Sequence, residues 1–376
     1  MKNNLEKFIN IETDKIHNIA KGVLYDVNNP NSKILAGDWD IKNIVPVQDY
    51  IIYKSLNDMF THGLPWKNTE LYKFIEHPIV SKKNNYMWGC KNINLLNKRG
   101  EYLHNLFENI KKNGVLKHEF VKNENDIDDD EIMIGFDRHG TPIAISQGNH
   151  RLAIAKILKI KTVPVKVYVR HTDWSNTRQE IIDFCNNTWN GKSYHPIPHP
   201  DFDEIFPIWS ENKYKCFIEN TSLGFGSTIL DLGSLFGYYA YKSELTGYSC
   251  TACETDQRYL EVMKKLHAAY NMKYNIIESN ILNIQSSEYD IVFAFNIFHH
   301  FLKNKVSYEK LKALLGRLKY KEMYIQFHQP GERQMADAYQ DYTEDEFVKF
   351  IINNSVEKTS YKCLGEENGR KIYKIY

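Results

Sequence analysis

The chain has 376 residues, of which 42% are hydrophobic and 25% are charged, a composition typical of soluble globular proteins and not of disordered or fibrous ones. At roughly 150 residues per domain, this length predicts two domains. The 48 Lys and Arg residues balance the 47 Asp and Glu residues, so the net charge disfavours a nucleic-acid partner. We find no apolar run of the roughly 18 residues that a membrane span needs and no signal-peptide core, and therefore expect a cytoplasmic protein without a membrane span.

The predicted domain boundary lies in residues 186–203, NNTWNGKSYHPIPHPDFD. This stretch contains prolines and a glycine and shows neither helical nor alternating periodicity, which is typical of a connector. We therefore predict an N-terminal domain over 1–185, a linker over 186–203 and a C-terminal domain over 204–376.

The most informative N-terminal segment is GFDRHGTPIAISQGNHRLAIAKILKIKTVPVKVYVRH. It predicts two strands, a helix that opens at Gly148–Asn149, and a further strand containing VPVKVYV. Asn149, His150 and Arg151 fall in the first turn of the helix. An arginine there is unfavourable for the helix dipole unless an anion such as phosphate binds beside it.

Over roughly residues 130–170, the segment resembles the ParB/sulfiredoxin-like nucleotide-binding fold, an α+β fold. The resemblance implies that Gly148, Asn149, His150 and Arg151 hold the phosphates of ATP or CTP with Mg²⁺. The other interpretation is a remnant of that fold, in which Arg151 pairs with a carboxylate.

Two other N-terminal features bear on this site. Asp38 and Asp40 flank Trp39 in LAGDWDIKN, and carboxylates brought to a phosphate site hold Mg²⁺ or act as a base. A turn closed by side-chain caps explains them equally well. Residues 50–112 are predicted to be a helical insertion whose aromatic residues belong to the core.

The C-terminal half alternates between apolar runs and helical patterns. Alternation of this kind predicts a parallel sheet covered on both faces. The chain then ends in two strand-like stretches with no helix between them, which predicts a closing antiparallel hairpin. The apolar runs are at 228–232, 248–253, 274–277, 290–295 and 322–327, the helical patterns are near 236–245, 256–270, 307–318 and 343–353, and the final stretches are 355–365 and 369–376.

A glycine turn follows the first of these strands in TILDLGSLFGYYAY. Asp231 lies at the strand end, Gly233 in the turn and Gly237 where the next helix begins, a geometry that lets a nucleotide-like ligand approach the backbone closely. Glu254 follows the next strand, about 20 residues beyond Gly233, where a carboxylate can accept both hydroxyls of a ribose.

With the closing hairpin, this pattern resembles the class I S-adenosylmethionine-dependent methyltransferases, which have a Rossmann-like sheet, over about residues 220–376. The resemblance implies that Asp231, Gly233 and Gly237 line the methionine part of the cofactor and that Glu254 holds the ribose. Asn280 would lie beside the adenine, although many family members have Asp there. A dinucleotide dehydrogenase is disfavoured because the full GxGxxG is absent.

The fourth strand of this half ends in FNIFHHF, which places Asn296, His299 and His300 at the floor of the expected substrate pocket. We also count Asn296 among the expected cofactor-binding residues. A neutral imidazole there can orient an acceptor hydroxyl or take its proton. His328 follows the fifth strand on the same rim. The spacing of these histidines matches no metal motif, so we predict no metal.

The function predicted from the sequence is methyl transfer to an oxygen or nitrogen of a glycan or small metabolite, with a second nucleotide site in the N-terminal domain. One alternative is a bifunctional enzyme whose N-terminal domain phosphorylates the substrate or hydrolyses a nucleotide. A DNA-binding ParB-like regulator is the weakest alternative, because no basic helix-turn-helix segment follows residue 170. The sequence predicts neither the acceptor nor the oligomeric state.

Overall fold

The computed structural model describes residues 8–23, 32–82, 86–115, 131–285, 287–356 and 360–376. The chain forms two compact units, Met1–Glu180 and Ile181–Tyr376. The division therefore falls after residue 180, inside a continuous helix, and not after residue 185 as the sequence pattern suggested.

The N-terminal unit is built on one mixed sheet with the strand order β1-β7-β5-β6-β2-β4, in which β3 also pairs with β7. Strands β5 and β7 run parallel, whereas β5 and β6 are antiparallel. The strands are β1 Phe8–Glu12, β2 Asn18–Ala20, β3 Lys33–Leu35, β4 Ile44–Pro46, β5 Met133–Phe136, β6 Pro142–Ala144 and β7 Thr162–His171.

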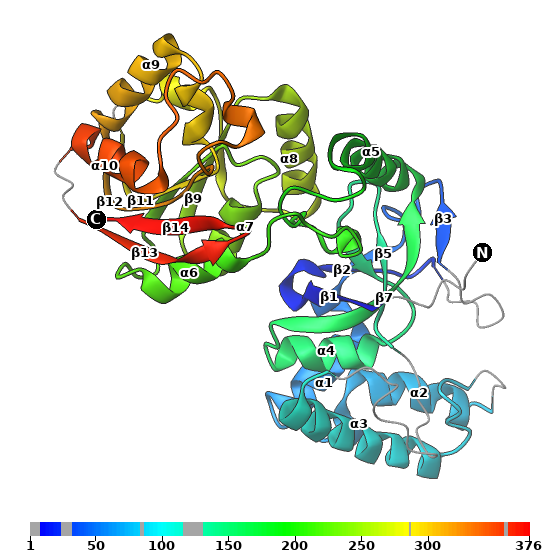
Figure 1. The fold of residues 1–376 in the computed structure, drawn as a ribbon. Coiled ribbons are helices and arrows are strands. Elements are labelled where there is room, and N and C mark those ends of the chain that lie inside the picture. The colour runs from blue at the N-terminus through cyan, green and yellow to red at the C-terminus, as the bar shows by residue number, and fades with distance from the viewer. Residues whose placement is uncertain (1–7, 24–31, 83–85, 116–130, 286, 357–359) are drawn as a thin grey trace. The chain divides into compact units, whose positions relative to one another are not determined.

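The helical insertion predicted between strands of this unit is present. Helices α1 and α3 of the insertion contact α4, the helix that begins at Asn149 (Figure 1). The predicted order of strand, strand, helix and strand around Gly148 is also found, as β5, β6, α4 and β7. The helices are α1 Ile51–Phe60, α2 Glu70–Val80, α3 Ile93–Asn113, α4 Asn149–Ile157 and α5 Thr172–Trp189, which continues into the second unit.

The C-terminal unit has the Rossmann-like sheet expected from its apolar runs. Its strand order is β10-β9-β8-β11-β12-β14-β13, in which the first five strands are parallel and the last two close the sheet in antiparallel pairing (Figure 1). The strands are β8 Thr228–Leu232, β9 Ser249–Glu254, β10 Asn275–Glu278, β11 Ser287–Phe295, β12 Leu318–Gln326, β13 Tyr361–Glu367 and β14 Arg370–Ile375. The helices are α6 Asn212–Asn220, α7 Tyr238–Leu245, α8 Gln257–Ala269, α9 Lys305–Leu315 and α10 Glu344–Asn354.

Residues 186–203 do not form the exposed linker that their prolines and glycine suggested. Residues 186–189 complete helix α5, and the side chains of Ser193, His195, His199 and Phe202 are buried within the C-terminal unit. The His195 ring packs against Tyr239 of α7 at 4.8 Å between centroids. The segment is therefore part of the C-terminal unit.

Both faces of the C-terminal sheet are packed. On one face, apolar residues of β8, β11 and β12 form a core with α9 and α10. On the other face, Phe217 of α6 packs on Phe293 and Tyr324. With both faces filled, the polar side chains that remain for a ligand lie at the strand ends.

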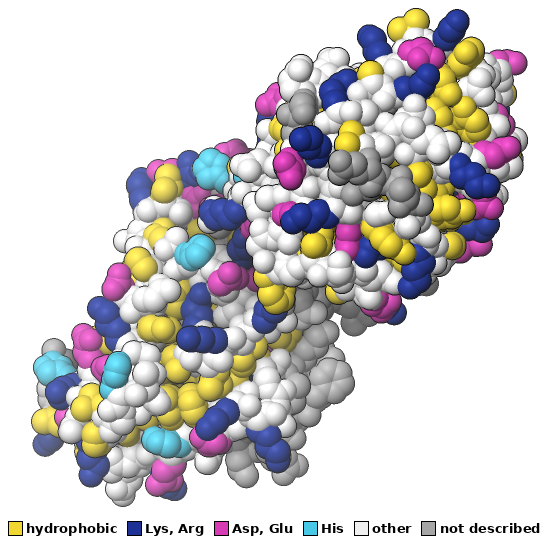
Figure 2. All heavy atoms as spheres, turned by 90° about the vertical axis from the view of Figure 1, so that its left-hand side faces the viewer, with side chains coloured by type: hydrophobic (Ala, Val, Ile, Leu, Met, Phe, Trp, Pro, Cys, Tyr) yellow, Lys and Arg dark blue, Asp and Glu magenta, His cyan; other side chains and the backbone are white. Residues whose placement is uncertain are grey.

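Two surface properties complete the description. No helix within the described residues combines the length and the apolar character that crossing a membrane requires. On the face shown in Figure 2, basic and acidic side chains are interspersed and do not gather into one block of a single sign.

Candidate active site in the C-terminal unit and candidate anion pocket in the N-terminal unit

The glycine turn between β8 and α7 has the backbone that the sequence predicted. Gly233 and Gly237 have φ of +74° and +80°, in the left-handed region that favours glycine. A Cβ atom at Gly233 would lie 2.8 Å from Cδ1 of Ile297, and one at Gly237 would lie 2.2 Å from the hydroxyl oxygen of Tyr274. The missing side chain of Gly233 thus lets Ile297, in the turn after β11, pack onto the turn after β8. The space beside Gly237 is filled by the side chain of Tyr274.

Asp231 lies in β8 just before this turn, and its side chain is buried. Its Oδ2 atom has no hydrogen-bond partner among the described residues. Burial raises the pKa of this carboxyl to about 7, a hydrogen bond from Ser234 lowers it, and the charge of Glu254 raises it further. A buried carboxylate oxygen without a donor is unfavourable, so the position at Oδ2 is suited to a ligand that brings a cationic or hydrogen-donating group.

Glu254 ends β9 and faces the same turn. Its carboxylate accepts hydrogen bonds from the backbone N–H groups of Leu235 at 2.9 Å, Thr255 at 2.7 Å and Asp256 at 3.0 Å. These contacts fasten β9 to the glycine turn and give Glu254 a structural role. A carboxylate has about four acceptor positions, so one is left for a ligand hydroxyl.

Asn280 follows β10 at the same edge of the sheet. Its Oδ1 atom accepts from the backbone N–H of Leu282 at 2.9 Å and so caps a 3₁₀ turn, Ile281–Asn283. This contact fixes the orientation of the amide and leaves Nδ2 as the group that can face a ligand.

Asn296 follows β11 with φ of +57° and is buried. Its Oδ1 atom accepts from Nη1 of Arg370 at 2.9 Å, and its Nδ2 atom has no hydrogen-bond partner among the described residues. Arg370 also forms two hydrogen bonds with the carboxylate of Glu332, at 2.9 and 2.6 Å. Its guanidinium lies 5.2 Å from the ring centre of Trp209.

The sequence patterns did not identify Arg370 or Glu332. The signal that could have found Arg370 is the direction of its strand. Because β14 runs antiparallel to β12, its first residue lies at the edge where the parallel strands end. Arg370 is that first residue.

The predicted histidines gather at this edge. The ring centres of His299 and His300 are 4.2 Å apart, and those of His299 and His328 are 5.5 Å apart. His328 Nε2 lies 2.9 Å from Oδ1 of Asp341. Nδ1 of His299 and Nδ1 of His328 are buried and have no hydrogen-bond partner among the described residues.

The electrostatics of His299 restrict its chemistry. Burial, followed by the nearby histidines and Arg370, lowers its pKa to about 2. The ring is therefore neutral at physiological pH, and it is better suited to orienting an acceptor than to holding a proton. In the part of the chain that the structure describes, no group of three or more His, Cys, Asp or Glu residues is arranged to hold a metal ion.

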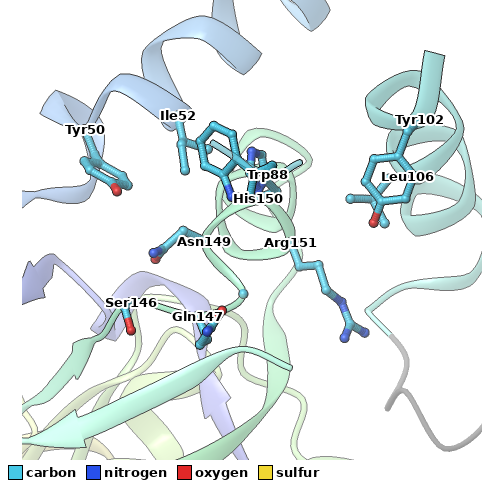
Figure 3. Close-up of a pocket in the computed structure, with 11 residues that line it drawn as sticks. Tyr50, Ile52, Trp88, Tyr102, Leu106, Ser146, Gln147, Asn149, His150 and Arg151 are labelled. Carbon is cyan, nitrogen blue, oxygen red and sulfur yellow. The ribbon is translucent and has the colours of Figure 1, made fainter. Parts of the chain in front are cut away.

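A second candidate site lies in the N-terminal unit. A cavity of about 60 Å³ opens at the start of α4 and is lined by Trp88, Tyr102, and the four residues of the predicted phosphate site, Gly148, Asn149, His150 and Arg151 (Figure 3). This volume accommodates a few water molecules or one small anion, whereas drug-sized ligands occupy about 300 Å³ or more.

The polar groups of this cavity are buried. Oδ1 of Asn149 and Nε2 of His150 have no hydrogen-bond partner among the described residues. Burial, reinforced by the charge of Arg99, lowers the pKa of His150 to about 3. Arg151 forms an ion pair with Glu131 at 2.9 Å. The carboxylate partner that the second interpretation of the sequence assigned to Arg151 is therefore present.

Asp38 and Asp40 do not join this cavity, contrary to the prediction that they would hold Mg²⁺ at the phosphate site. Both oxygens of Asp40 bind Arg138, at 2.9 and 2.7 Å, and Asp38 binds Arg138 at 3.2 Å. Arg138 lies two residues beyond the end of β5. The residues before α4 lie at the other end of this strand, where the N–H of its first residue, Met133, donates to the carbonyl of Gln147. The carboxylates therefore stabilise a turn at the opposite end of the strand.

Comparison with known proteins bears on the C-terminal unit. Residues 230–317 match the family model described as a methyltransferase domain. The C-terminal unit thus contains a region similar to methyltransferase domains, and domains of this kind use S-adenosylmethionine. No curated protein matches the sequence.

Solved structures with low similarity to the chain include a crystal structure of monomeric WbdD, with 18% identity and a TM-score of 0.41, covering 49% of this chain and 46% of that one. A structure titled as the bifunctional kinase-methyltransferase WbdD has 17% identity and a TM-score of 0.39, with coverages of 52% and 45%. The N-methyltransferase NodS from Bradyrhizobium japonicum WM9 has 12% identity and a TM-score of 0.35, with coverages of 44% and 92%. The chain thus spans less than half the length of these WbdD chains.

Proposed function

We propose that the C-terminal unit transfers a methyl group from S-adenosylmethionine to an oxygen or nitrogen atom of a small metabolite or glycan. The observation that supports this most strongly is a set of buried polar atoms at the carboxyl ends of β8, β11 and β12 that have no hydrogen-bond partner within the described part of the chain. Such atoms are rare in native proteins and call for a ligand. Besides Asp231 Oδ2, Asn296 Nδ2 and His299 Nδ1, the set includes His328 Nδ1 and Gln326 Oε1.

The residues present fit the cofactor. Asp231 offers a buried anionic oxygen where the cationic methionine portion would lie, and Glu254 has one acceptor position left for a ribose hydroxyl. Asn280 offers its amide to the adenine. The cofactor supplies an activated methyl group, so the protein contributes mainly alignment and exclusion of water. His299 and His300 orient the acceptor, and His328, held by Asp341, supports them.

Calorimetry with S-adenosylmethionine and S-adenosylhomocysteine tests this proposal. We expect binding at micromolar strength, weakened about tenfold by Glu254→Gln, because the amide keeps the shape of the side chain but loses charge and half of the acceptor oxygens. Glu278→Gln is the matched control, since Glu278 lies in the neighbouring strand and is exposed. Absence of binding by either compound would overturn the proposal.

We also propose that the pocket at α4 binds the phosphate end of ATP or CTP. Nε2 of His150, which has no hydrogen-bond partner among the described residues and can carry the ring proton, supports an anion there together with the N–H groups at the start of α4. The cavity has room for a phosphate group but not for a whole nucleotide, and none of its described lining residues is acidic. The pocket therefore supports binding of the phosphate end. The kinase or hydrolase alternative also needs carboxylates to hold Mg²⁺, and the described residues that line the pocket include none.

Titration with ATP, CTP and inorganic phosphate tests this second site. Arg151→Met should weaken each of them, and the control Arg333→Met removes one exposed positive charge from the other unit. Equal affinities of both variants and the unaltered protein would remove the basis for a phosphate site.

A further inference from the structure

The side chain of Asn296 has an orientation that its bond with Arg370 fixes. Arg370 carries only hydrogen-bond donors, so the atom of Asn296 that faces it at 2.9 Å is the oxygen. Rotating the amide by half a turn would place two donors against each other. The Nδ2 atom must therefore point away from Arg370.

Arg370 is itself held on several sides. Glu332 binds it through two oxygens, the Trp209 ring lies beneath it, and its own carbonyl accepts from Nε2 of Gln326 at 3.1 Å. Paired contacts of this kind fix both the plane and the position of a guanidinium. The chain thus uses three separate segments to set the direction of one amide.

The Nδ2 atom fixed in this way is a donor at the edge where the methyl acceptor would bind. Asn296 is 5% exposed, and Nδ2 has no hydrogen-bond partner among the described residues. The turn that carries it packs on the glycine turn through Ile297. The hydroxyl of Tyr194, whose pKa burial raises, also lies near the amide, and this contact acts to lower that pKa, although it does not reach the geometry of a hydrogen bond.

A hydrogen-bond donor at this point favours an oxygen atom over an amine nitrogen as the methyl acceptor. A neutral amine has one lone pair, and a donor that binds this lone pair blocks the attack. An oxygen has at least two, so one can accept from Nδ2 while another attacks. An amine nucleophile would instead need acceptor groups for its N–H bonds.

We infer that Arg370 is a positioning residue that turns the Asn296 amide to present its N–H donors, and that the methyl acceptor is consequently an oxygen atom. This inference rests on the proposed methyltransferase function and narrows it. In the reaction, an oxygen lone pair forms the C–O bond while the C–S bond breaks and its electron pair returns to sulfur. A hydroxyl acceptor releases its proton to water, and an ionised oxygen has none to release.

A matched pair of probes, phenol and aniline, tests this inference in protein saturated with S-adenosylhomocysteine. The readout is the side-chain amide resonance of Asn296 in protein labelled with ¹⁵N-asparagine, assigned by its loss in Asn296→Asp. Phenol should shift this resonance saturably and bind about tenfold more tightly than aniline, the ratio expected for one buried hydrogen bond.

Three variants complete the test, and the affinity of each variant for phenol and for aniline is measured. Arg370→Lys should lose the preference for phenol, because an ammonium group cannot bind Asn296 and both oxygens of Glu332 in one plane. The affinity of this variant for S-adenosylhomocysteine should stay unchanged. Asn296→Asp should invert the preference. Asn271→Asp is the control, since Asn271 also has a left-handed backbone, with φ of +47°, but is exposed.

The outcomes separate the two proposals. If S-adenosylhomocysteine does not bind, the methyltransferase proposal fails, and this inference fails with it. If it binds but the Asn296 resonance responds equally or more strongly to aniline, or responds to neither probe, only the oxygen-acceptor inference is overturned. A preference for phenol that survives Arg370→Lys would remove the positioning role of Arg370.

Discussion

Helices α4 and α7 begin in the same way and differ in what surrounds their first turns. Each opens at a left-handed glycine, Gly148 or Gly237, without a side-chain cap. The turn before α7 lies among carboxylates, whereas the turn before α4 lies beside the imidazole of His150 and the guanidinium of Arg151, which pairs with Glu131. From this difference we expect the two turns to bind different ligands although they share a backbone motif. Carboxylates suit the hydroxyls and cationic groups of a nucleoside, and basic groups suit phosphate.

The largest expected effect concerns the buried acid beside α7. The native pKa of Asp231 is about 7, against 3.8 ordinarily, so the ionised form destabilises the native state by about 4 kcal/mol above pH 7. Asp231→Asn should therefore raise the free energy of unfolding at pH 8 by up to this amount, and the gain should shrink as pH falls toward 4. Urea unfolding at several pH values measures it.

A second carboxylate, Asp256, serves as the control, because its replacement should change the free energy of unfolding in the opposite direction. Asp256 has a lowered pKa, chiefly because Arg258 binds it, and it caps α8. Asp256→Asn should therefore lower stability at neutral pH. If Asp231→Asn also lowered stability at pH 8, Asp231 would be a structural residue and not a destabilising group kept for a ligand.

The second effect compares the two glycines directly. A Cβ atom at Gly148 would lie 2.4 Å from Cα of Ile132, which cannot move aside, whereas at Gly237 the nearest atom is the end of the Tyr274 side chain. Gly148→Ala should cost about 3 kcal/mol or more and Gly237→Ala about 2 kcal/mol. Tyr274→Phe should recover part of the loss only for Gly237→Ala, and urea unfolding of the single and double variants measures this difference.

The third effect is the pH dependence of cofactor binding. A cationic ligand favours ionised Asp231, whose free-protein pKa is about 7, so binding below pH 7 requires release of a proton. The affinity for S-adenosylmethionine should fall about tenfold between pH 8 and pH 6. Calorimetry in buffers of different ionisation enthalpy measures the proton release, and a flat profile would exclude Asp231 from the binding site.

The smallest effect concerns α4. Glu131 neutralises Arg151 in the present structure. Glu131→Gln should release the guanidinium and strengthen ATP binding about fivefold, equivalent to about 1 kcal/mol. Glu108→Gln, at an exposed position of α3, is the control, and calorimetry is the measurement. Weaker binding in Glu131→Gln would mean that Glu131 holds Arg151 in its binding position.

Local signals predicted much of the fold. The apolar runs of β8 to β12 and the closing hairpin could be identified from the sequence because buried parallel strands have continuous apolar sequences. Residues 186–203 were misassigned because proline and glycine indicate local backbone shape and do not show whether His195 or Phe202 is buried. Composition cannot supply that tertiary information.

The sequence predicted those residues of the candidate sites that lie close together in short strand-and-turn segments. Asp231, Gly233 and Glu254 were identified from strand-and-turn spacing and lie around one turn in the structure. Pairs formed across the fold could not be predicted, since the bond between Arg370 and Asn296 joins residues 74 positions apart. The contact of Asp40 with Arg138, 98 positions apart, likewise explains why those carboxylates were assigned to the wrong end of β5.

The central claim is that the two glycine turns bind different ligands, and one crossed titration tests it. S-adenosylmethionine and ATP are each titrated into the full chain and into Glu254→Gln and Arg151→Met. We expect Glu254→Gln to weaken only S-adenosylmethionine and Arg151→Met to weaken only ATP, each by about tenfold. Absence of S-adenosylmethionine binding to the unaltered chain, or an equal loss of both ligands in either variant, would contradict this account.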